Sequence, residues 1–159
     1  MTLRDDVDAG LAAVGTSDGQ TPLALDKRGA CVVTVPVPKQ VVALTDEKLL
    51  VQVQLGPGGR HFSLRSALAR LRETPDAALG EALLQRHYYP SPIGGLSFAL
   101  SPEDDTLVAC YHWILDRIDV SQFEAVFAAY TTGIFGLVVE IAAMARNDGS
   151  LQPIHPDAG

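Results

Sequence analysis

The fold is decided by one stretch near the C-terminus, which reads LSFAL at residues 96–100, SPEDD at 101–105, LVACYHWIL at 107–115 and FEAVFAAYTTGIFGLVVEIAAM at 123–144. Two apolar runs joined by a turn rich in proline and aspartate predict a β-hairpin. The last segment has apolar residues at the three- and four-residue spacing of one helix face. A hairpin followed by a long helix predicts the centre of a small α+β domain.

The residues before this stretch add a helix and three strands. Apolar residues recur every three to four positions over residues 3–14 and predict a short first helix. Residues 22–25 and 30–35 flank a turn at 26–29 that ends in glycine, so they predict a hairpin. Residues 49–55 alternate apolar and polar side chains, which predicts a half-buried antiparallel strand with one wetter face.

Two helices are predicted in the middle of the chain, over residues 63–73 and 77–88, because leucines recur there at helical spacing. The predicted fold is therefore α+β. It has an antiparallel sheet of about five strands, an N-terminal helix, a middle helical segment and a long C-terminal helix, in the order α-β-β-β-α-β-β-α. We expect a single domain over residues 1–146 and a disordered tail over residues 147–159, which is polar and contains glycine and proline.

Composition narrows the classes of function. The chain has 159 residues, of which 47% are hydrophobic and 19% charged, as in a globular domain. Its formal net charge of −7 disfavours binding to nucleic acid, whose phosphates it would repel. The arginines between Arg60 and Arg72 alternate with leucines and are interpreted as the solvated face of a helix.

We expect a soluble cytoplasmic protein with no membrane insertion. The N-terminus is acidic and lacks the apolar core of a signal peptide. The charge-free part of the last helix, residues 125–139, is shorter than the ~20 residues that span a bilayer. Cys31 and Cys110 lie in apolar strand runs, which favours buried free thiols over a disulfide.

No pattern of reactive residues predicts catalysis, a metal or a cofactor. Cys110 and His112 would share one face of a strand and could offer two metal ligands, but no second pair completes a site. The acidic residues 103–105 lack the spacing of a calcium loop. The glycine-rich residues 56–59 are not followed by the Lys-Ser/Thr of a phosphate loop. The sequence therefore argues against an enzyme.

The last helix is apolar or small on its second face as well, at Ala128, Thr131, Phe135, Val139, Ala142 and Ala143. A helix of this kind must bury both faces. It either presents a partner or dimer surface, which we favour because a single sheet covers one face only, or lies enclosed in the core.

Three further pieces of sequence carry a resemblance. LALDKRGAC at residues 23–31 looks like a strand ending in Leu-Asp, a turn with glycine and a returning strand. LL at 83–84, followed by GLSFAL at 95–100, looks like a second helix that leads into a fourth strand. Phe123, Phe127 and Leu137 are spaced as in a final apolar helix. Together with size, acidity and element order, they make roughly residues 1–146 resemble the class I chaperones of bacterial type III secretion, the Tir-chaperone-like family.

The resemblance implies a non-enzymatic, cytoplasmic homodimer with a role in virulence and protein transport, serving one effector or several. Such a chaperone binds the N-terminal chaperone-binding segment of secreted effectors, keeps it soluble and secretion-competent, and directs it to the secretion ATPase. The residues expected to bind the effector are Val33, Val35, Val51, Val53, Phe123 and Phe127. Those expected at the dimer interface are Leu79, Leu83, Leu84, Tyr111 and Trp113.

Two other functions stay open at the level of sequence. One is a small adaptor or regulatory domain that binds a folded partner. The other is an enzyme with a hydrophobic pocket between the sheet and the long helix. An extended client, a folded partner and a bound small molecule would distinguish the three.

Overall fold

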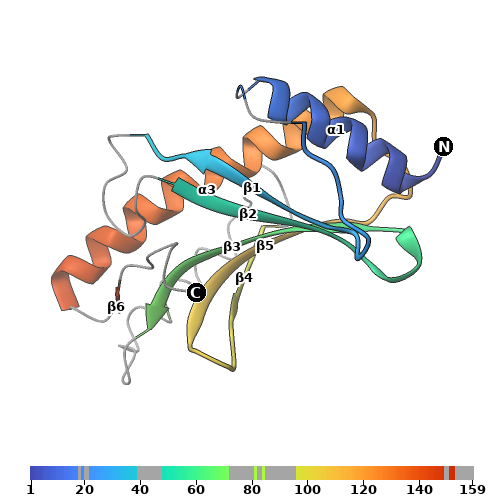
Figure 1. Cartoon of the computed structure of the whole chain (residues 1–159). Helices are drawn as coiled ribbons and strands as arrows, with labels where there is room; N and C mark the ends of the chain where they lie inside the picture. The colour runs from blue at the N-terminus through green and yellow to red at the C-terminus, as the bar shows by residue number, and fades with distance from the viewer. Residues whose placement is uncertain are drawn as a thin grey trace.

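The computed structural model describes residues 1–17, 19, 22–38, 48–71, 81, 84, 96–148 and 151–152 of the chain. In it, two helices pack against a twisted antiparallel sheet (Figure 1). The elements are α1 (Leu3–Ser17), β1 (Ala30–Pro36), β2 (Lys48–Leu55), the 3-10 turn η1 (Pro57–Gly59), β3 (Phe62–Leu71), β4 (Ser97–Leu100), β5 (Thr106–Trp113), α3 (Val120–Asp148) and β6 (Leu151–Gln152). The predicted α+β class, with an N-terminal helix, a five-strand antiparallel sheet and a long C-terminal helix, is confirmed.

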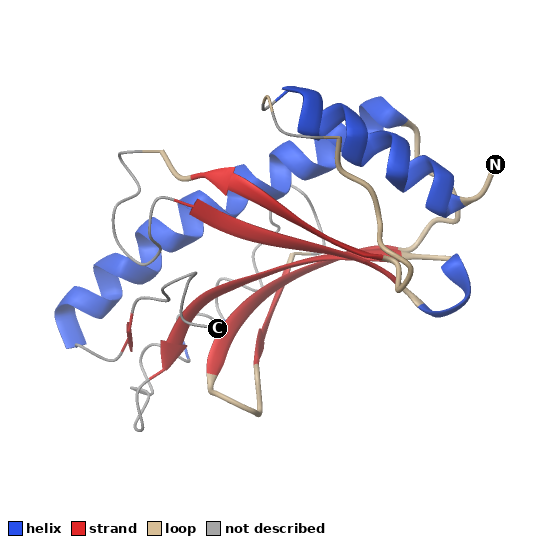
Figure 2. Cartoon of the chain, viewed as in Figure 1, coloured by secondary structure: helices blue, strands red, loops and turns tan. Residues whose placement is uncertain are grey.

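The sheet has the strand order β1-β2-β3-β5-β4, with β6 paired to β3 away from this path. β1 pairs with β2 from Ala30 to Pro36, but β2 pairs with β3 only from Gln52 to Leu55. The β1–β2 ribbon therefore diverges from the β3–β5–β4 ribbon beyond that point (Figure 2).

One hydrophobic core lies between the sheet and the two helices. Strand side chains of β1, β2, β3 and β5 alternate into it, and α1 and α3 each contribute an apolar stripe. Its largest fully buried side chain is Tyr130, whose hydroxyl lies 3.1 Å from Ser66 Oγ and donates to the carbonyl oxygen of Ala109 at 3.2 Å. These hydrogen bonds fix α3 to the centre of β3 and β5, because a buried hydroxyl must find partners.

α1 and α3 pack closely because α1 has a glycine at the contact. A Cβ atom built on Gly10 would lie 2.4 Å from the Phe123 ring, too close for any side chain larger than hydrogen. Next to this contact, Arg117 Nε donates to Asp6 Oδ2 at 2.6 Å, and the Ile118 amide donates to the same oxygen at 3.3 Å. These bonds join α1 to the segment that connects β5 to α3.

The predicted helix over residues 63–73 is wrong, since Phe62–Leu71 form β3. Phe62, Leu64 and Leu68 are buried, and Arg65 between them is exposed, which is the two-residue alternation of a strand. Leu64 and Leu68 are four residues apart, a spacing that fits one face of a helix and one face of a strand equally well. This ambiguity produced the error.

The strand predicted over residues 22–25 is also not formed. The Leu25 amide donates to Asp8 Oδ1 at 2.7 Å, and Arg4 Nη2 donates to the carbonyls of Leu25 and Asp26. Side chains of α1 thus bind the backbone groups that a β-ladder would have used. The glycine turn forms as predicted, with the Gly29 amide donating to the Asp26 carbonyl at 3.0 Å, but β1 pairs with β2.

Two predictions fall largely outside the described residues. Of the helix predicted over residues 77–88, only Glu81 and Leu84 are described, and both are helical. In the predicted tail, α3 continues to Asp148 and Leu151–Gln152 pair with β3, whereas residues 153–159 are not described. The domain boundary at residue 146 stays a prediction.

Candidate functional site

The two faces of the sheet differ in what covers them. The inner face packs against α1 and α3, whereas neither of these helices covers the outer face (Figure 1). Strand register assigns to the outer face the side chains of Val32, Thr34, Leu50, Gln52, Gln54, Ser63, Arg65, Ala67, Ser97, Ala99, Val108, Cys110 and His112. The helices that the structure describes therefore leave the outer face open to a partner.

Rows of side chains cross the outer face from strand to strand. The row Val32, Gln52, Arg65, Cys110 and Ser97 spans all five strands, because each residue is the register partner of the next. Its centre is polar and its β1 end is apolar. Residues from five separate segments are thus brought side by side by the register alone.

A groove of ≈ 1000 Å³ runs over this face between the two ribbons. Three large exposed apolar side chains line it: Val32 and Leu50 are 54% and 40% exposed on the β1–β2 side, and Leu100 is 48% exposed on β4. Val108 on β5 is half-buried in its wall. Apolar side chains gathered around an open groove are typical of an interaction surface.

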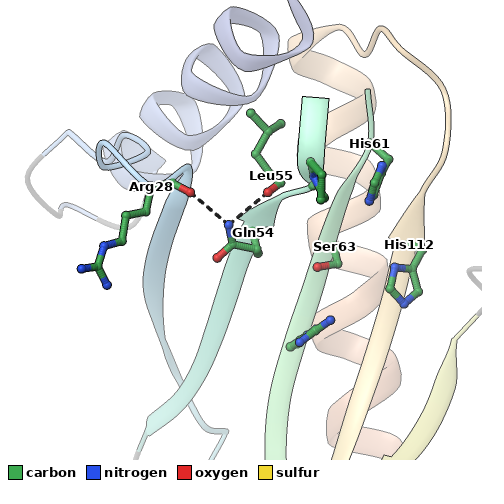
Figure 3. A pocket seen from close by; sticks show the side chains of 9 residues that line it. Arg28, Gln54, Leu55, His61, Ser63 and His112 are labelled. Atoms are coloured by element: carbon green, nitrogen blue, oxygen red, sulfur yellow. Dashed lines mark hydrogen bonds between the residues drawn. The ribbon is translucent and has the colours of Figure 1, made fainter. Parts of the chain in front are cut away.

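A smaller polar pocket of ≈ 430 Å³ lies beside the groove (Figure 3). Gln54, Ser63 and His112 form one register row across β2, β3 and β5, and His61 immediately precedes the first residue of β3. Gln54 Nε2 donates to the carbonyls of Arg28 and Leu55, at 3.2 and 3.0 Å, which ties the turn before β1 to the end of β2. Arg65, next to Ser63 on the same face, completes the lining.

Gly56 gives the pocket its shape. Its amide donates to the His61 carbonyl at 2.9 Å, and a Cβ atom at this position would lie 2.0 Å from His61 Nε2. Any larger residue would push the imidazole out of place. The glycine that ends β2 therefore allows His61 to lie across the backbone at the mouth of the pocket.

The sheet also offers two edges. β1 pairs only with β2, and β4 pairs only with β5, among the strands that the structure describes. An extended polypeptide can extend a sheet at such an edge through main-chain hydrogen bonds. The groove and the edges are on the same two ribbons.

The structure brings the predicted effector-binding residues together, but in the core. Val33, Val51, Val53, Phe123 and Phe127 are buried on the inner face, and Val35 is half-buried there. Alternation along β1 and β2 identified the strands, but it could not say which face the helices cover. Their contribution to client binding stays a prediction, and a direct contact falls more naturally to the outer-face residues of the same strands.

The predicted dimer residues do not form one surface among the described residues. Tyr111 is buried, and Trp113 is half-buried, stacks on Phe62 with ring centroids 6.2 Å apart, and donates from Nε1 to the Arg117 carbonyl. Leu84 is 75% exposed, whereas Leu79 and Leu83 lie outside the described residues. The dimer interface stays a prediction.

The second face of α3 is only partly covered. Thr131 is buried, Phe135 is half-buried, and Ala128 and Val139 are exposed. By length and composition the segment Val120–Glu140 could cross a bilayer, and it is the one such helix in the part of the chain that the structure describes. In the structure its apolar stripe packs on the sheet.

Two features of the described part of the chain bear on catalysis, its metal-ligating side chains and its thiols. Among the described residues, no group of three or more His, Cys, Asp or Glu could hold a metal ion. Cys31 and Cys110 are free thiols, and burial raises the pKa of each above its ordinary value. A raised pKa keeps a thiol protonated and weakly nucleophilic at neutral pH.

Sequence reasoning missed the groove and the pocket. Leu50 lies on the wetter face of its strand, and an apolar residue there was a usable signal for an interaction surface. The meeting of Arg65 with Gln54 and His112 depends on register between distant strands and left no local signal.

No protein-family model and no curated protein matches the sequence. Among solved structures, the ExsC–ExsE complex matches with a TM-score of 0.60 and 16% identity, over 94% of this chain and 98% of the other. The HopA1–SchA chaperone–effector complex matches with a TM-score of 0.55 and 15% identity, over 79% of this chain and 88% of the other.

A third match is the heterodimeric ExoU–SpcU complex from the type III secretion system of Pseudomonas aeruginosa. Its TM-score is 0.53 and its identity 16%, over 84% of this chain and 95% of the other. The chain thus has a class I type III secretion chaperone-like fold, as the resemblance implied.

Proposed function

We propose that this protein is a type III secretion chaperone that binds an extended segment of a secreted effector on the outer face of its sheet. One observation carries the proposal: a chaperone-like fold leaves a groove of ≈ 1000 Å³, lined by exposed Val32, Leu50 and Leu100, uncovered by its two packed helices. The similar solved structures include a chaperone bound to its effector, which supports the same role here.

The groove suits an extended polypeptide better than a small molecule. Its apolar side chains stand on opposite walls, on the β1–β2 ribbon and on β4, so alternate side chains of an extended segment can reach both. Main-chain hydrogen bonds at the edges of β1 or β4 would add affinity that does not depend on sequence. The net charge of −7 would keep the complex soluble.

The finer parts of the proposal concern the client and the assembly. The segment is the N-terminal chaperone-binding region of the effector, and the complex is delivered to the secretion ATPase. The chaperone acts in the cytoplasm as a homodimer without catalytic activity, through an isologous interface that includes Leu79, Leu83, Leu84, Tyr111 and Trp113. Val33, Val35, Val51, Val53, Phe123 and Phe127 would contribute by holding the strands that form the groove.

The test is co-purification of the tagged protein from its native organism, followed by limited proteolysis and mass spectrometry. The expected result is one protected stretch of tens of residues from the N-terminal region of a secreted protein. A compact, fully folded partner would instead support the adaptor function. If no partner co-purifies, the protein shares the fold of the similar solved structures but not their function.

Matched variants locate the contact. Leu50→Asp places a charge in the groove and should abolish recovery of the fragment. Val139→Asp makes the same change in charge at an exposed apolar residue of α3, 44% exposed and outside the groove, and should leave recovery unchanged. The reverse pattern would move the binding surface to α3.

A further inference from the structure

The polar pocket beside the groove concentrates hydrogen-bond donors. Arg65, His61, Ser63 and His112 line it, and Ser63 is buried. Arg28 lines the opposite wall through its backbone, and its guanidinium points away from the other side chains (Figure 3). No aspartate or glutamate is among the described residues that line the pocket.

This composition stands out in an acidic protein. No carboxylate of the described residues lies within salt-bridge distance of Arg65. The nearby Asp26 is already engaged, because its Oδ1 accepts the amides of Arg28 and Ala30 at 2.8 and 2.9 Å. Hydrogen bonds from the Ala30 amide and, more weakly, the Arg28 amide lower the pKa of Asp26 and keep it ionised. Its carboxylate therefore binds backbone amides of its own turn. Within the part of the chain that the structure describes, Arg65 is therefore available to an anion.

The pocket and the groove are continuous. Arg65 and His112 line both of them. Along β3, Ser63 and Arg65 are neighbours on one face, so the pocket lies roughly 7 Å along the strand from the polar row at the centre of the groove. That distance is the reach of one side chain from a segment lying in the groove. A guanidinium can bind a carboxylate through two parallel hydrogen bonds, which adds geometric specificity to charge.

We infer that this pocket accepts an acidic side chain, Asp or Glu, of the polypeptide segment that lies in the groove. The inference rests on the proposed function and adds a specificity element to it. The net charge of −7 disfavours acidic clients in general, whereas the pocket favours one carboxylate at one position. Ser63, His61 and His112 would donate to the carboxylate oxygens that Arg65 leaves free.

The first experiment tests the pocket without a client, by NMR on the isotopically labelled full-length protein. The probes are glutamate capped at both termini, glutamine capped in the same way, and inorganic phosphate. Capped glutamate should cause saturable shifts at His61, Ser63 and His112, and capped glutamine should cause none. Arg65→Gln should abolish these shifts. Arg60→Gln removes the same charge from an exposed arginine outside the pocket and should preserve them.

Two results of this experiment would overturn the inference. If capped glutamate causes no shifts at the pocket, or causes the same shifts in Arg65→Gln, the pocket does not bind carboxylates through Arg65. If phosphate saturates the pocket and displaces capped glutamate, the pocket serves a free anion and not a client side chain.

The second experiment uses the protected client fragment and separates the two proposals. Each acidic residue of the fragment is changed to its amide, and affinity is measured for the wild-type protein, Arg65→Gln and Arg60→Gln. At one position of the fragment, the change to the amide should weaken binding about ten-fold to the wild-type protein and to Arg60→Gln. The same change should have no effect on binding to Arg65→Gln. A fragment that binds with no position coupled to Arg65 would overturn the inference and leave the proposed function standing. If no fragment exists, the proposed function fails, and the client part of the inference fails with it.

Discussion

The inner and outer faces of the sheet are built from alternate residues of the same strands, yet they do different work. On β2, Val51 is fully buried beneath α1 and α3, whereas Leu50 beside it is exposed in the groove. On β3, Leu64 is buried and Arg65 lines the polar pocket. The inner face thus packs the core, and the outer face is the proposed binding surface, so single substitutions one residue apart can separate stability from binding.

The largest expected effect comes from a charge placed on the inner face. Val51→Asp would bury an unpaired carboxylate in the core and should lower the free energy of unfolding by several kcal/mol. Leu50→Asp on the outer face should change it by about 0.5 kcal/mol or less. Urea unfolding of both variants measures the difference, and similar losses would contradict the division between faces.

Overpacking of the helix contact should have the next largest effect. Gly10→Ala places a methyl group 2.4 Å from the Phe123 ring, so it should lower the free energy of unfolding by roughly 1–3 kcal/mol. Gly136→Ala is the matched control, since nothing lies within 4 Å of its added Cβ atom on α3. That variant should be stabilised by up to about 1 kcal/mol because alanine favours a helix. Thermal unfolding measures both changes. If the two variants change stability in the same direction, α1 and α3 do not pack closely at Gly10.

A smaller effect is expected from the buried hydroxyl. Tyr130→Phe keeps the ring and removes the hydrogen bonds to Ser66 and Ala109, so it should lower the free energy of unfolding by about 1 kcal/mol. Ser97→Ala on the outer face removes a hydroxyl that donates to the Cys110 carbonyl at 3.3 Å and should have a smaller effect. Denaturant unfolding of the two variants measures the difference. A larger loss of unfolding free energy from Ser97→Ala than from Tyr130→Phe would contradict the prediction.

The smallest effect concerns pH. Hydrogen bonds from Arg117 hold the pKa of Asp6 below its ordinary value of 3.8. A carboxyl whose pKa is lower in the folded state stabilises the fold above pH 3.8, and this contribution is lost as pH falls through the folded-state pKa. Arg117 is 59% exposed and its charge is screened by solvent, so the contribution should be modest.

The variant Asp6→Asn tests this linkage. Its stability should fall less steeply than that of wild type as pH is lowered below 3.8, as followed by denaturant unfolding at each pH. Equal slopes for the two proteins would show that Asp6 does not carry acid sensitivity.

Much of the fold could be predicted because its elements have strong local periods. The strand predicted over residues 30–35 was observed as Ala30–Pro36, and the one predicted over 49–55 as Lys48–Leu55. β3 was missed because leucines four residues apart fit both a helix and a strand. Residues 22–25 were misread because their backbone partners, Arg4 and Asp8, are on α1, far away in sequence.

The candidate site was less predictable than the fold. Alternation in β1 and β2 separates two faces but does not say which face α1 and α3 will cover, so Val51 was assigned to the client and Leu50 was not. The pocket depends on the pairing of Ser63 with Gln54 and His112, which is set by register across three strands. Only tertiary structure supplies that information.

The central claim is that the client lies on the outer face, and site-specific photo-crosslinking tests it most directly. A photoreactive residue is placed at Leu50 in one variant and at Val139 in another, and each is irradiated in complex with the co-purified client. We expect a crosslink to the client segment from position 50 and none from position 139. A crosslink from position 139 alone would contradict the claim and place the client on α3.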